Sequence, residues 1–269
     1  MWITKNYSGK IQQEYKIESK LLEIKGIRHN LEIFNSKTFE SIALIDEQIF
    51  LKTMLALQSE LLAHICACSH QEPKRVLIAD NFNLELAFEF LRYSELKVDF
   101  LQFDLKILES LISFFPHYQE VMKNANFKLI PQQQEEFLEQ NEQRASLYDI
   151  IIATDESQFH CYKKLLSEDG ILVLKIPHLL LDISKTKEIL ESLGEEFRIK
   201  MPFYIPMSLD MQDFYIFASK KYHPTADIIL QRADMLEDLE YYNANLHLSA
   251  FVLPQKVKKH YLGLLVIEL

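Results

Sequence analysis

The chain has 269 residues, of which 48% are hydrophobic and 12% aromatic, so it can bury a large core, and global disorder is excluded. Its formal net charge of -10 argues against non-specific nucleic-acid binding, because phosphate contacts need a concentrated basic surface. The apolar runs are shorter than the roughly 18 residues that a membrane span needs, and the sequence does not open on a secretory leader pattern, so we expect a cytoplasmic protein with no membrane partner.

Residues 2–50 are predicted to form antiparallel strands. The segments EYKIESKLLEIK, HNLEIFNS and FESIALIDEQIF alternate in part between apolar and polar residues and are rich in β-branched and aromatic types. Between Leu51 and Ser69 the apolar residues instead recur at helical spacing, over a face broad enough for a buried helix. This change predicts a small N-terminal β-strand domain over residues 1–50 and a larger domain over residues 51–269.

Beyond residue 69, short apolar segments alternate with helical ones along most of the chain. The predicted strands are VLIAD, VDFLQFD, FKLIP, YDIIIATD, GILVLKIP and FYIFASKK. Between them, helices are predicted over LELAFEFLRY, ILESLISFF, EEFLEQ, HCYKKLLSE and residues 183–193. Apolar strands in this rhythm are typical of a Rossmann-like α/β fold, whose parallel-rich sheet carries helices on both faces. Ligands of such sheets bind beyond the carboxyl ends of the strands.

The cysteines do not indicate a metal or redox site. Cys66 and Cys68 are two positions apart, which is not the CxxC spacing, and Cys161 leaves the count odd. We therefore expect free, buried thiols and no metal.

Six stretches match one family in order and in spacing. They are SELLAH (59–64), FFPH (114–117), YDIII (148–152), LSEDGILVL (166–174), FASKK (217–221) and YYNANLHLSAFVLP (241–254). In the last and most specific stretch, the family pattern is reproduced by Tyr241, Tyr242, Asn243, His247, Phe251, Leu253 and Pro254. Over nearly its whole length, the chain resembles the spermidine synthases, the polyamine aminopropyltransferase family.

The resemblance implies an N-terminal β-hairpin domain on a methyltransferase-like Rossmann domain, assembled as a homodimer or homotetramer. It also implies transfer of the aminopropyl group of decarboxylated S-adenosylmethionine to putrescine, which gives spermidine and methylthioadenosine. This single displacement needs no metal and no covalent intermediate, and the sulfonium donor is a co-substrate rather than a cofactor. Because the attacking amine must first lose a proton, an acidic side chain near it has to accept that proton, and carboxylates are expected to bind the other ammonium groups.

The donor site departs from the family pattern. The family's glycine-rich turn aligns with residues 80–85, where no glycine remains, so the sequence predicts a reshaped nucleoside pocket. Asp80 and Asn83 are expected to bind the donor. Gln102 takes the position of the ribose partner with an uncharged amide, and Asp104 matches a family aspartate next to that position. The alternative role for the acids and amides at these strand ends is N-capping of the following helix.

The acceptor site departs as well. The family's catalytic base aligns with Thr154, and the connection that follows is much shorter than the family's flap, so a lid over the site is either missing or comes from elsewhere. We predict Asp155 as the surviving base, with Glu156 beside it as a substrate-binding carboxylate. His64 matches a family histidine that faces the polyamine site, although a histidine on an apolar helix face is commonly a core residue. Glu60, one helical turn earlier, either shares that face or is a solvated charge.

Two further acids, Asp210 and Asp213, lie in the connection of a predicted hairpin near the end of the sheet. They either meet a cationic amine there or are ordinary exposed loop residues. Of the C-terminal signature, Tyr241 and Tyr242 either line the pocket or pack the segment, and for His247 we expect packing.

Three functions remain open from the sequence. The first is an active aminopropyltransferase with a rearranged site, which we favour because the match extends over both domains and carboxylates remain near each lost one. The second is a non-catalytic member that binds nucleoside or polyamine weakly, as a scaffold or partner subunit, and the lost glycines and flap support it. The third, a methyltransferase using ordinary S-adenosylmethionine, leaves the N-terminal strands and the YYN to LP stretch unexplained.

Overall fold

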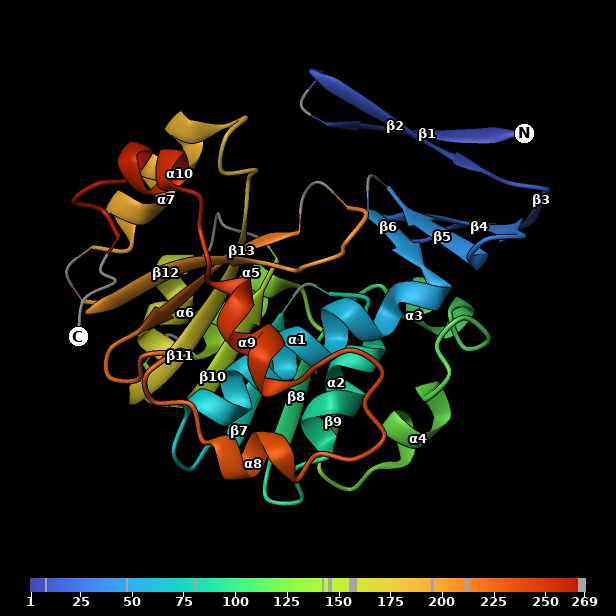
Figure 1. The fold of residues 1–269 in the computed structure, drawn as a ribbon. Helices are drawn as coiled ribbons and strands as arrows, with labels where there is room; N and C mark the ends of the chain where they lie inside the picture. Colours follow the sequence, from blue (N-terminus) through green and yellow to red (C-terminus); the bar gives the residue numbers. More distant parts are fainter. Residues whose placement is uncertain are drawn as a thin grey trace.

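The N-terminal part of the chain is made of six strands in two antiparallel sheets, which stand beside the main body in Figure 1. The computed structural model describes residues 1–265 except residues 8, 47, 80, 142, 145–146, 155–158, 195 and 211–212, and of Phe159 only the backbone. The strands are β1 (Trp2–Tyr7) paired with β2 (Ile11–Lys16), then β3 (Ser19–Lys25), β4 (Asn30–Ser36), β5 (Glu40–Ile45) and β6 (Gln48–Leu51) in chain order. The antiparallel strands predicted within residues 2–50 are confirmed.

A 3-10 turn (Lys52–Met54) leads into helix α1 (Leu55–Ser69), as the helical spacing of this stretch predicts. The helix is apolar around most of its circumference and packs against α2 (Leu84–Leu91) and α8 (Leu230–Asp234). Nearly all of its side chains are buried. Polar residues on α1 must therefore find their hydrogen-bond partners inside the protein.

The main sheet has seven strands in the order β12-β13-β11-β10-β7-β8-β9. The strands are β7 (Arg75–Ala79), β8 (Lys97–Leu101), β9 (Phe127–Ile130), β10 (Tyr148–Ala153), β11 (Leu166–Ile176), β12 (Ile199–Tyr204) and β13 (Phe214–Ser219). The first five run parallel, and β12 and β13 form an antiparallel hairpin at one edge. After β7 the chain moves outward to β8 and β9 and then returns to β10. The strand order thus reverses between β7 and β10, and ligands of open α/β sheets bind at such a switch point.

Helices cover both faces of this sheet (Figure 1). Neighbouring residues of a strand point to opposite faces, so Val76 and Ile78 join the core that contains α1 and α2, whereas Leu77 and Ala79 join the core on the other face. The remaining helices are α3 (Leu105–Ser110), α4 (Tyr118–Lys123), α5 (Gln134–Asn141), α6 (Phe159–Leu165), α7 (Ile183–Ser192), α9 (Ala244–Ala250) and α10 (Gln255–His260). The predicted Rossmann-like α/β fold is confirmed.

Several element boundaries differ from the prediction, and the helix predicted over ILESLISFF already ends at Ser110. The strand VDFLQFD ends at Leu101, so Gln102 and Asp104 lie just beyond β8. The pattern HCYKKLLSE predicted a helix through residue 168, but β11 already begins at Leu166. The reason is that Leu166 is buried and its backbone pairs with Tyr148 at the start of β10, which outweighs the helical spacing.

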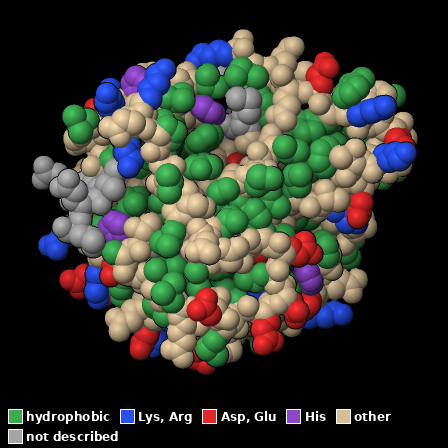
Figure 2. Space-filling model, in the orientation of Figure 1, with side chains coloured by type: hydrophobic (Ala, Val, Ile, Leu, Met, Phe, Trp, Pro, Cys, Tyr) green, Lys and Arg blue, Asp and Glu red, His purple; other side chains and the backbone are tan. Residues whose placement is uncertain are grey.

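Further observations concern the metal, membrane and nucleic-acid functions that the sequence argued against. Cys66 and Cys68 are buried free thiols, as predicted, whereas Cys161 is a free thiol that is only half-buried. Among the described helices, none combines the length and apolar character needed to cross a membrane. On the face drawn in Figure 2, the Lys and Arg side chains that the structure describes are scattered along the edge rather than gathered into one patch.

Candidate active site

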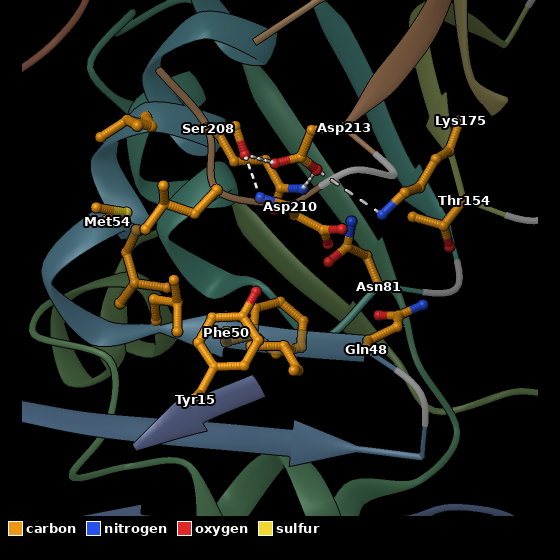
Figure 3. A pocket seen from close by; sticks show the side chains of 16 residues that line it. Tyr15, Gln48, Phe50, Met54, Asn81, Thr154, Lys175, Ser208, Asp210 and Asp213 are labelled. Atoms are coloured by element: carbon orange, nitrogen blue, oxygen red, sulfur yellow. Dashed lines mark hydrogen bonds and ion pairs between the residues drawn. The ribbon is translucent and has the colours of Figure 1, made fainter. Parts of the chain in front are cut away.

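A pocket lies at the switch point of the main sheet. Asn81, Thr154 and Lys175, at the carboxyl ends of β7, β10 and β11, form one of its sides. Residues 48–51 of β6 and the start of α1 form a second side, and the connection between β12 and β13 forms a third (Figure 3). Three distant parts of the chain therefore meet at the place where this fold binds its ligands.

Asp213 is a buried carboxylate of this pocket. Its Oδ1 accepts hydrogen bonds from Gln58 Nε2 and from the Tyr215 hydroxyl, both at 3.3 Å, and its Oδ2 accepts one from the Ser208 hydroxyl. The Lys175 ammonium lies 3.9 Å from Oδ1. Burial raises the pKa of Asp213, and the positive charge of Lys175 opposes this rise. Four side chains thus hold this carboxylate in place.

Asp210 is the second carboxylate of the pocket and comes from the same connection. Its Oδ2 accepts a hydrogen bond from Lys5 Nζ at 3.0 Å, and its Oδ1 accepts one from the Tyr7 hydroxyl at 3.2 Å. Burial lowers the pKa of Lys5, and the charge of Asp210 counteracts this effect. Burial also raises the pKa of Tyr15, which lines the pocket from β2, to about 12. Neither Asp210 nor Asp213 is the exposed loop acid that the sequence left as an alternative.

A second pocket, of about 110 Å³, lies beyond the carboxyl ends of β8 and β9. Gln102 borders it after β8, and Gln132 and Gln134 border it after β9. The turn between β3 and β4 covers it with Arg28 and His29. This is the side of the sheet on which the sequence predicts the nucleoside of the donor.

The amide of Gln102 is fixed from both ends. Its Nε2 donates to the backbone carbonyl of Asn81 at 3.2 Å, and its Oε1 accepts from the backbone N–H of Asp104 at 2.9 Å. Each end of an amide has the capacity for one more hydrogen bond, so a ribose hydroxyl can still be bound. The contact with Asn81 also links this second pocket to the first, because Asn81 borders the first.

Asp104 is fully buried and faces the N-terminal sheet. Its Oδ2 accepts hydrogen bonds from the backbone N–H groups of Ile27, Arg28 and His29 at 2.9, 3.2 and 3.3 Å. It occupies the N-cap position of α3 but makes no capping hydrogen bond. A Cβ atom at Gly26 would stand 2.5 Å from Oδ1 of Asp104, so any other residue there would have to displace this carboxylate. This carboxylate therefore ties the β3–β4 turn to the main domain.

Asparagine side chains shape the turn that replaces the glycines of the family pattern. Asn81 Oδ1 accepts from the backbone N–H of Asn83 at 2.7 Å, and Asn83 Oδ1 caps α2 by accepting from the Glu85 N–H at 3.1 Å. The Asn83 Nδ2 donates to the Ser59 hydroxyl at 2.9 Å. Phe82, between the two asparagines, is buried against the His29 ring, with ring centroids 5.0 Å apart. These contacts hold the turn in place, and the reshaped nucleoside pocket stays a prediction.

His64 and Glu60 both make their contacts inside the protein. His64 is fully buried, with Nδ1 2.9 Å from the Tyr93 hydroxyl and Nε2 3.1 Å from Glu89 Oε2. It does not line the switch-point pocket, and these contacts favour a core role, so its assignment to the substrate stays a prediction. Glu60 accepts hydrogen bonds from the backbone N–H groups of residues 240–242 at 2.9, 2.9 and 2.6 Å. The alternative of a solvated charge at Glu60 is wrong.

The C-terminal signature packs the end of the chain. His247 is fully buried, with Nδ1 2.8 Å from the Tyr242 hydroxyl and Nε2 2.9 Å from the Pro224 carbonyl oxygen. The Tyr241 hydroxyl donates to the carbonyl oxygen of Pro206. Packing, rather than the pocket, accounts for these residues, as predicted for His247.

Comparison with known proteins assigns this architecture to a family. Residues 55–229 match the model of the spermine/spermidine synthase domain, and residues 1–52 match that of the spermidine synthase tetramerisation domain. The chain belongs to the spermine/spermidine synthase family. The polyamine aminopropyltransferases of Helicobacter acinonychis (strain Sheeba) and Helicobacter pylori (strain G27) are 40% and 38% identical to it, over 96% of this chain and 97% of each relative.

Solved structures of the family share the fold. The crystal structure of spermidine synthase from Thermotoga maritima has a TM-score of 0.85 at 20% identity, covering 97% of this chain and 94% of that one. A spermidine synthase solved in complex with the transition-state analogue AdoDATO gives the same values.

Of the residues predicted for the family's site, the structure brings some together. Gln102 borders the second pocket and bonds to Asp104, which holds the β3–β4 turn, whereas Asn83 bonds to Ser59 of α1. Asp80, Asp155 and Glu156 lie outside the described residues, so their roles stay predictions.

Sequence reasoning missed several residues of the switch-point pocket. Lys175 is a charged residue at the end of the otherwise apolar strand GILVLKIP, and that interruption was a usable signal. Tyr15, which also lines the pocket, and Lys5, which pairs with Asp210 of the pocket, gave no such signal, because polar and aromatic residues are ordinary in a two-stranded sheet.

Proposed function

We propose that the protein is a polyamine aminopropyltransferase that transfers the aminopropyl group of decarboxylated S-adenosylmethionine to putrescine. The observation that supports this most is the switch-point pocket, which lies where this fold binds its ligands and is lined by the carboxylates of Asp210 and Asp213. The second pocket, linked to the first through Asn81, lies where a nucleoside is bound in this fold.

The chemistry requires one amine of putrescine to be uncharged. Its nitrogen forms a bond to the carbon beside the sulfonium, the carbon–sulfur bond breaks, and methylthioadenosine leaves with the electron pair on sulfur. In this proposal Asp155, directly after Thr154 in the chain, accepts the proton of the attacking amine, and Glu156 binds substrate. We further propose a homodimer or homotetramer, on the strength of the match of residues 1–52 to a tetramerisation domain. A cytoplasmic location, without nucleic-acid or membrane partners, stays a prediction.

A single assay tests the activity. The purified protein is incubated with putrescine and either decarboxylated or ordinary S-adenosylmethionine, and the products are separated. We expect spermidine and methylthioadenosine in equal amounts with the decarboxylated donor alone. Absence of methylthioadenosine across a wide pH range would contradict the proposal, and a methylated product from the ordinary donor would indicate a methyltransferase.

The non-catalytic alternative has one observation in its favour. Asp104, expected near the donor, spends its Oδ2 on the β3–β4 turn, and Gln102 is already bonded at both ends. Calorimetric titration with methylthioadenosine addresses it, since tight binding would show that the nucleoside site is intact.

A further inference from the structure

A lysine ammonium of the chain itself is already paired with a carboxylate of the switch-point pocket. Lys5 Nζ lies 3.0 Å from Oδ2 of Asp210, and the Lys5 side chain is 2% exposed. The same ammonium lies 5.0 Å from the centre of the Tyr7 ring. Lys5 belongs to β1, whereas Asp210 lies in the β12–β13 connection, so this contact joins the N-terminal sheet to a residue that lines the pocket.

This is the arrangement that proteins use to bind an alkylammonium ligand. A carboxylate supplies the counter-charge, and an aromatic ring supplies a face with negative potential. The Tyr7 hydroxyl also donates to Asp210, at 3.2 Å from Oδ1, which orients the carboxylate toward the ammonium. Lys5 is therefore chemically equivalent to one end of a bound diamine.

The other carboxylate of the pocket is also paired with a lysine. Asp213 has Lys175 at 3.9 Å, together with hydrogen bonds from Gln58, Tyr215 and Ser208. Both described acids of the pocket thus have a protein ammonium as partner. A second ammonium that approaches such a paired, half-buried carboxylate is repelled by the lysine ammonium already there. It therefore binds less strongly than it would to a free carboxylate.

We propose that Lys5 is a specificity-determining residue, which fills the cation position on Asp210 and so reduces the preference of the acceptor pocket for a diamine over a monoamine. The inference rests on the proposed function and concerns the far end of the acceptor. Asp210 stays paired with Lys5 when an acceptor binds, and the far ammonium of a diamine gains little from it. When the Lys5 charge is removed, Asp210 becomes available to bind the far ammonium of the substrate.

The test compares putrescine with n-butylamine, which has the same length but lacks the second amine. For each protein, kcat/KM for putrescine is divided by kcat/KM for n-butylamine, so that general damage to the enzyme cancels. We expect Lys5→Met and Lys5→Gln to raise this ratio about tenfold over the natural protein, as the loss of one like charge near the far ammonium requires. Met keeps the buried stem, and Gln also keeps a hydrogen-bond donor for Asp210.

Lys10→Met is the matched control. Lys10 lies in the turn of the same hairpin, and its ion pair with Asp182 is on the surface, with side chains 52% and 23% exposed. The ratio should not change in this variant. An unchanged or lower ratio in both Lys5 variants would overturn the proposal, because Lys5 would then merely support the pocket.

A binding measurement separates this inference from the proposed function. Calorimetric titration with putrescine should give a Kd about tenfold lower for the Lys5 variants than for the natural protein and Lys10→Met. If no protein yields methylthioadenosine, the proposed function fails while the binding comparison still decides the role of Lys5. Equal putrescine binding by all four proteins would overturn it.

Discussion

Asp104 shows how much a single buried carboxylate can stabilise. Its Oδ2 accepts three backbone hydrogen bonds from the β3–β4 turn. Hydrogen bonds to a charged group contribute about 1.5–3 kcal/mol each and are not fully additive, so we expect Asp104→Ala to lower the free energy of unfolding by about 3 kcal/mol. Urea denaturation measures this. Asp182→Ala, which removes a surface ion pair, is the control and should cost below about 1 kcal/mol; equal losses would contradict the assignment.

His247 makes stability depend on pH. Burial lowers its pKa to about 4, against about 6.5 in an unfolded chain. Between these values the unfolded chain binds a proton that the folded protein does not, so its contribution is complete above the unfolded pKa and is lost as the pH falls toward the folded one. His247→Gln should reduce this loss, seen as a smaller difference between urea midpoints at pH about 7.5 and about 5. A difference between the two midpoints as large in His247→Gln as in the natural protein would contradict this role of His247.

The predicted base can be separated from its neighbours by kinetics. An amide cannot accept the proton of the attacking amine, so Asp155→Asn should lower kcat by about 100-fold or more. Thr154→Ala, at the position that aligns with the family's base, should leave kcat within about tenfold, and Glu156→Gln should act mainly on KM. Steady-state assays of methylthioadenosine release give these values. If Glu156→Gln lost as much kcat as Asp155→Asn, the base would have to be reassigned.

At the scale of elements, the β3–β4 turn links the N-terminal sheet to the second pocket. A Cβ at Gly26 would stand 2.5 Å from Asp104 Oδ1, and the turn carries Arg28 and His29 over the pocket. Gly26→Ala should therefore cost about 1–3 kcal/mol and weaken methylthioadenosine binding. The clash involves Asp104, so in an Asp104→Ala background the same substitution should cost clearly less. Additive effects in this double-mutant cycle would contradict the contact.

The elements themselves were largely predictable, whereas their partners were not. Apolar runs such as VLIAD and YDIIIATD are strands because both faces of a parallel sheet are covered, and the structure has them as β7 and β10. The ends of the predicted strands likewise indicated Gln102 and Asp104 as candidate site residues. The role of Asp104 could not be inferred, because its three N–H partners are 75 to 77 residues away in the chain. Lys5 pairs with an acid 205 residues away, and no local pattern carries that information.

At the scale of the whole molecule, the pocket depends on contacts between segments that are distant in sequence. The N-terminal hairpins, the centre of the main sheet and the β12–β13 connection each supply one side. The C-terminal segment adds no described side chain to the pocket lining, but Tyr241 bonds to the carbonyl of Pro206, which lies in that connection. The family signature at residues 241–254 therefore supports the β12–β13 connection, which forms one side of the pocket.

Glu60 is the residue through which α1 holds that segment, and its removal should loosen the end of the chain first. The carboxylate accepts backbone hydrogen bonds from residues 240–242, and Gln offers only one oxygen in place of two. Glu60→Gln should therefore lower the free energy of unfolding by about 2 kcal/mol. It should also allow proteases to cut the segment around residue 240 under conditions in which the rest of the protein stays folded. The reason is that a local opening needs less free energy than global unfolding.

Glu240→Gln is the matched variant for this prediction, since it makes the same chemical change on an exposed side chain of the same segment. Limited proteolysis followed by mass spectrometry locates the first cut in each protein. A first cut near residue 240 in Glu60→Gln alone would show that α1 restrains the C-terminal segment through this carboxylate. The same first cut and the same rate in both variants would mean that Tyr241, Tyr242 and His247 hold the segment without it.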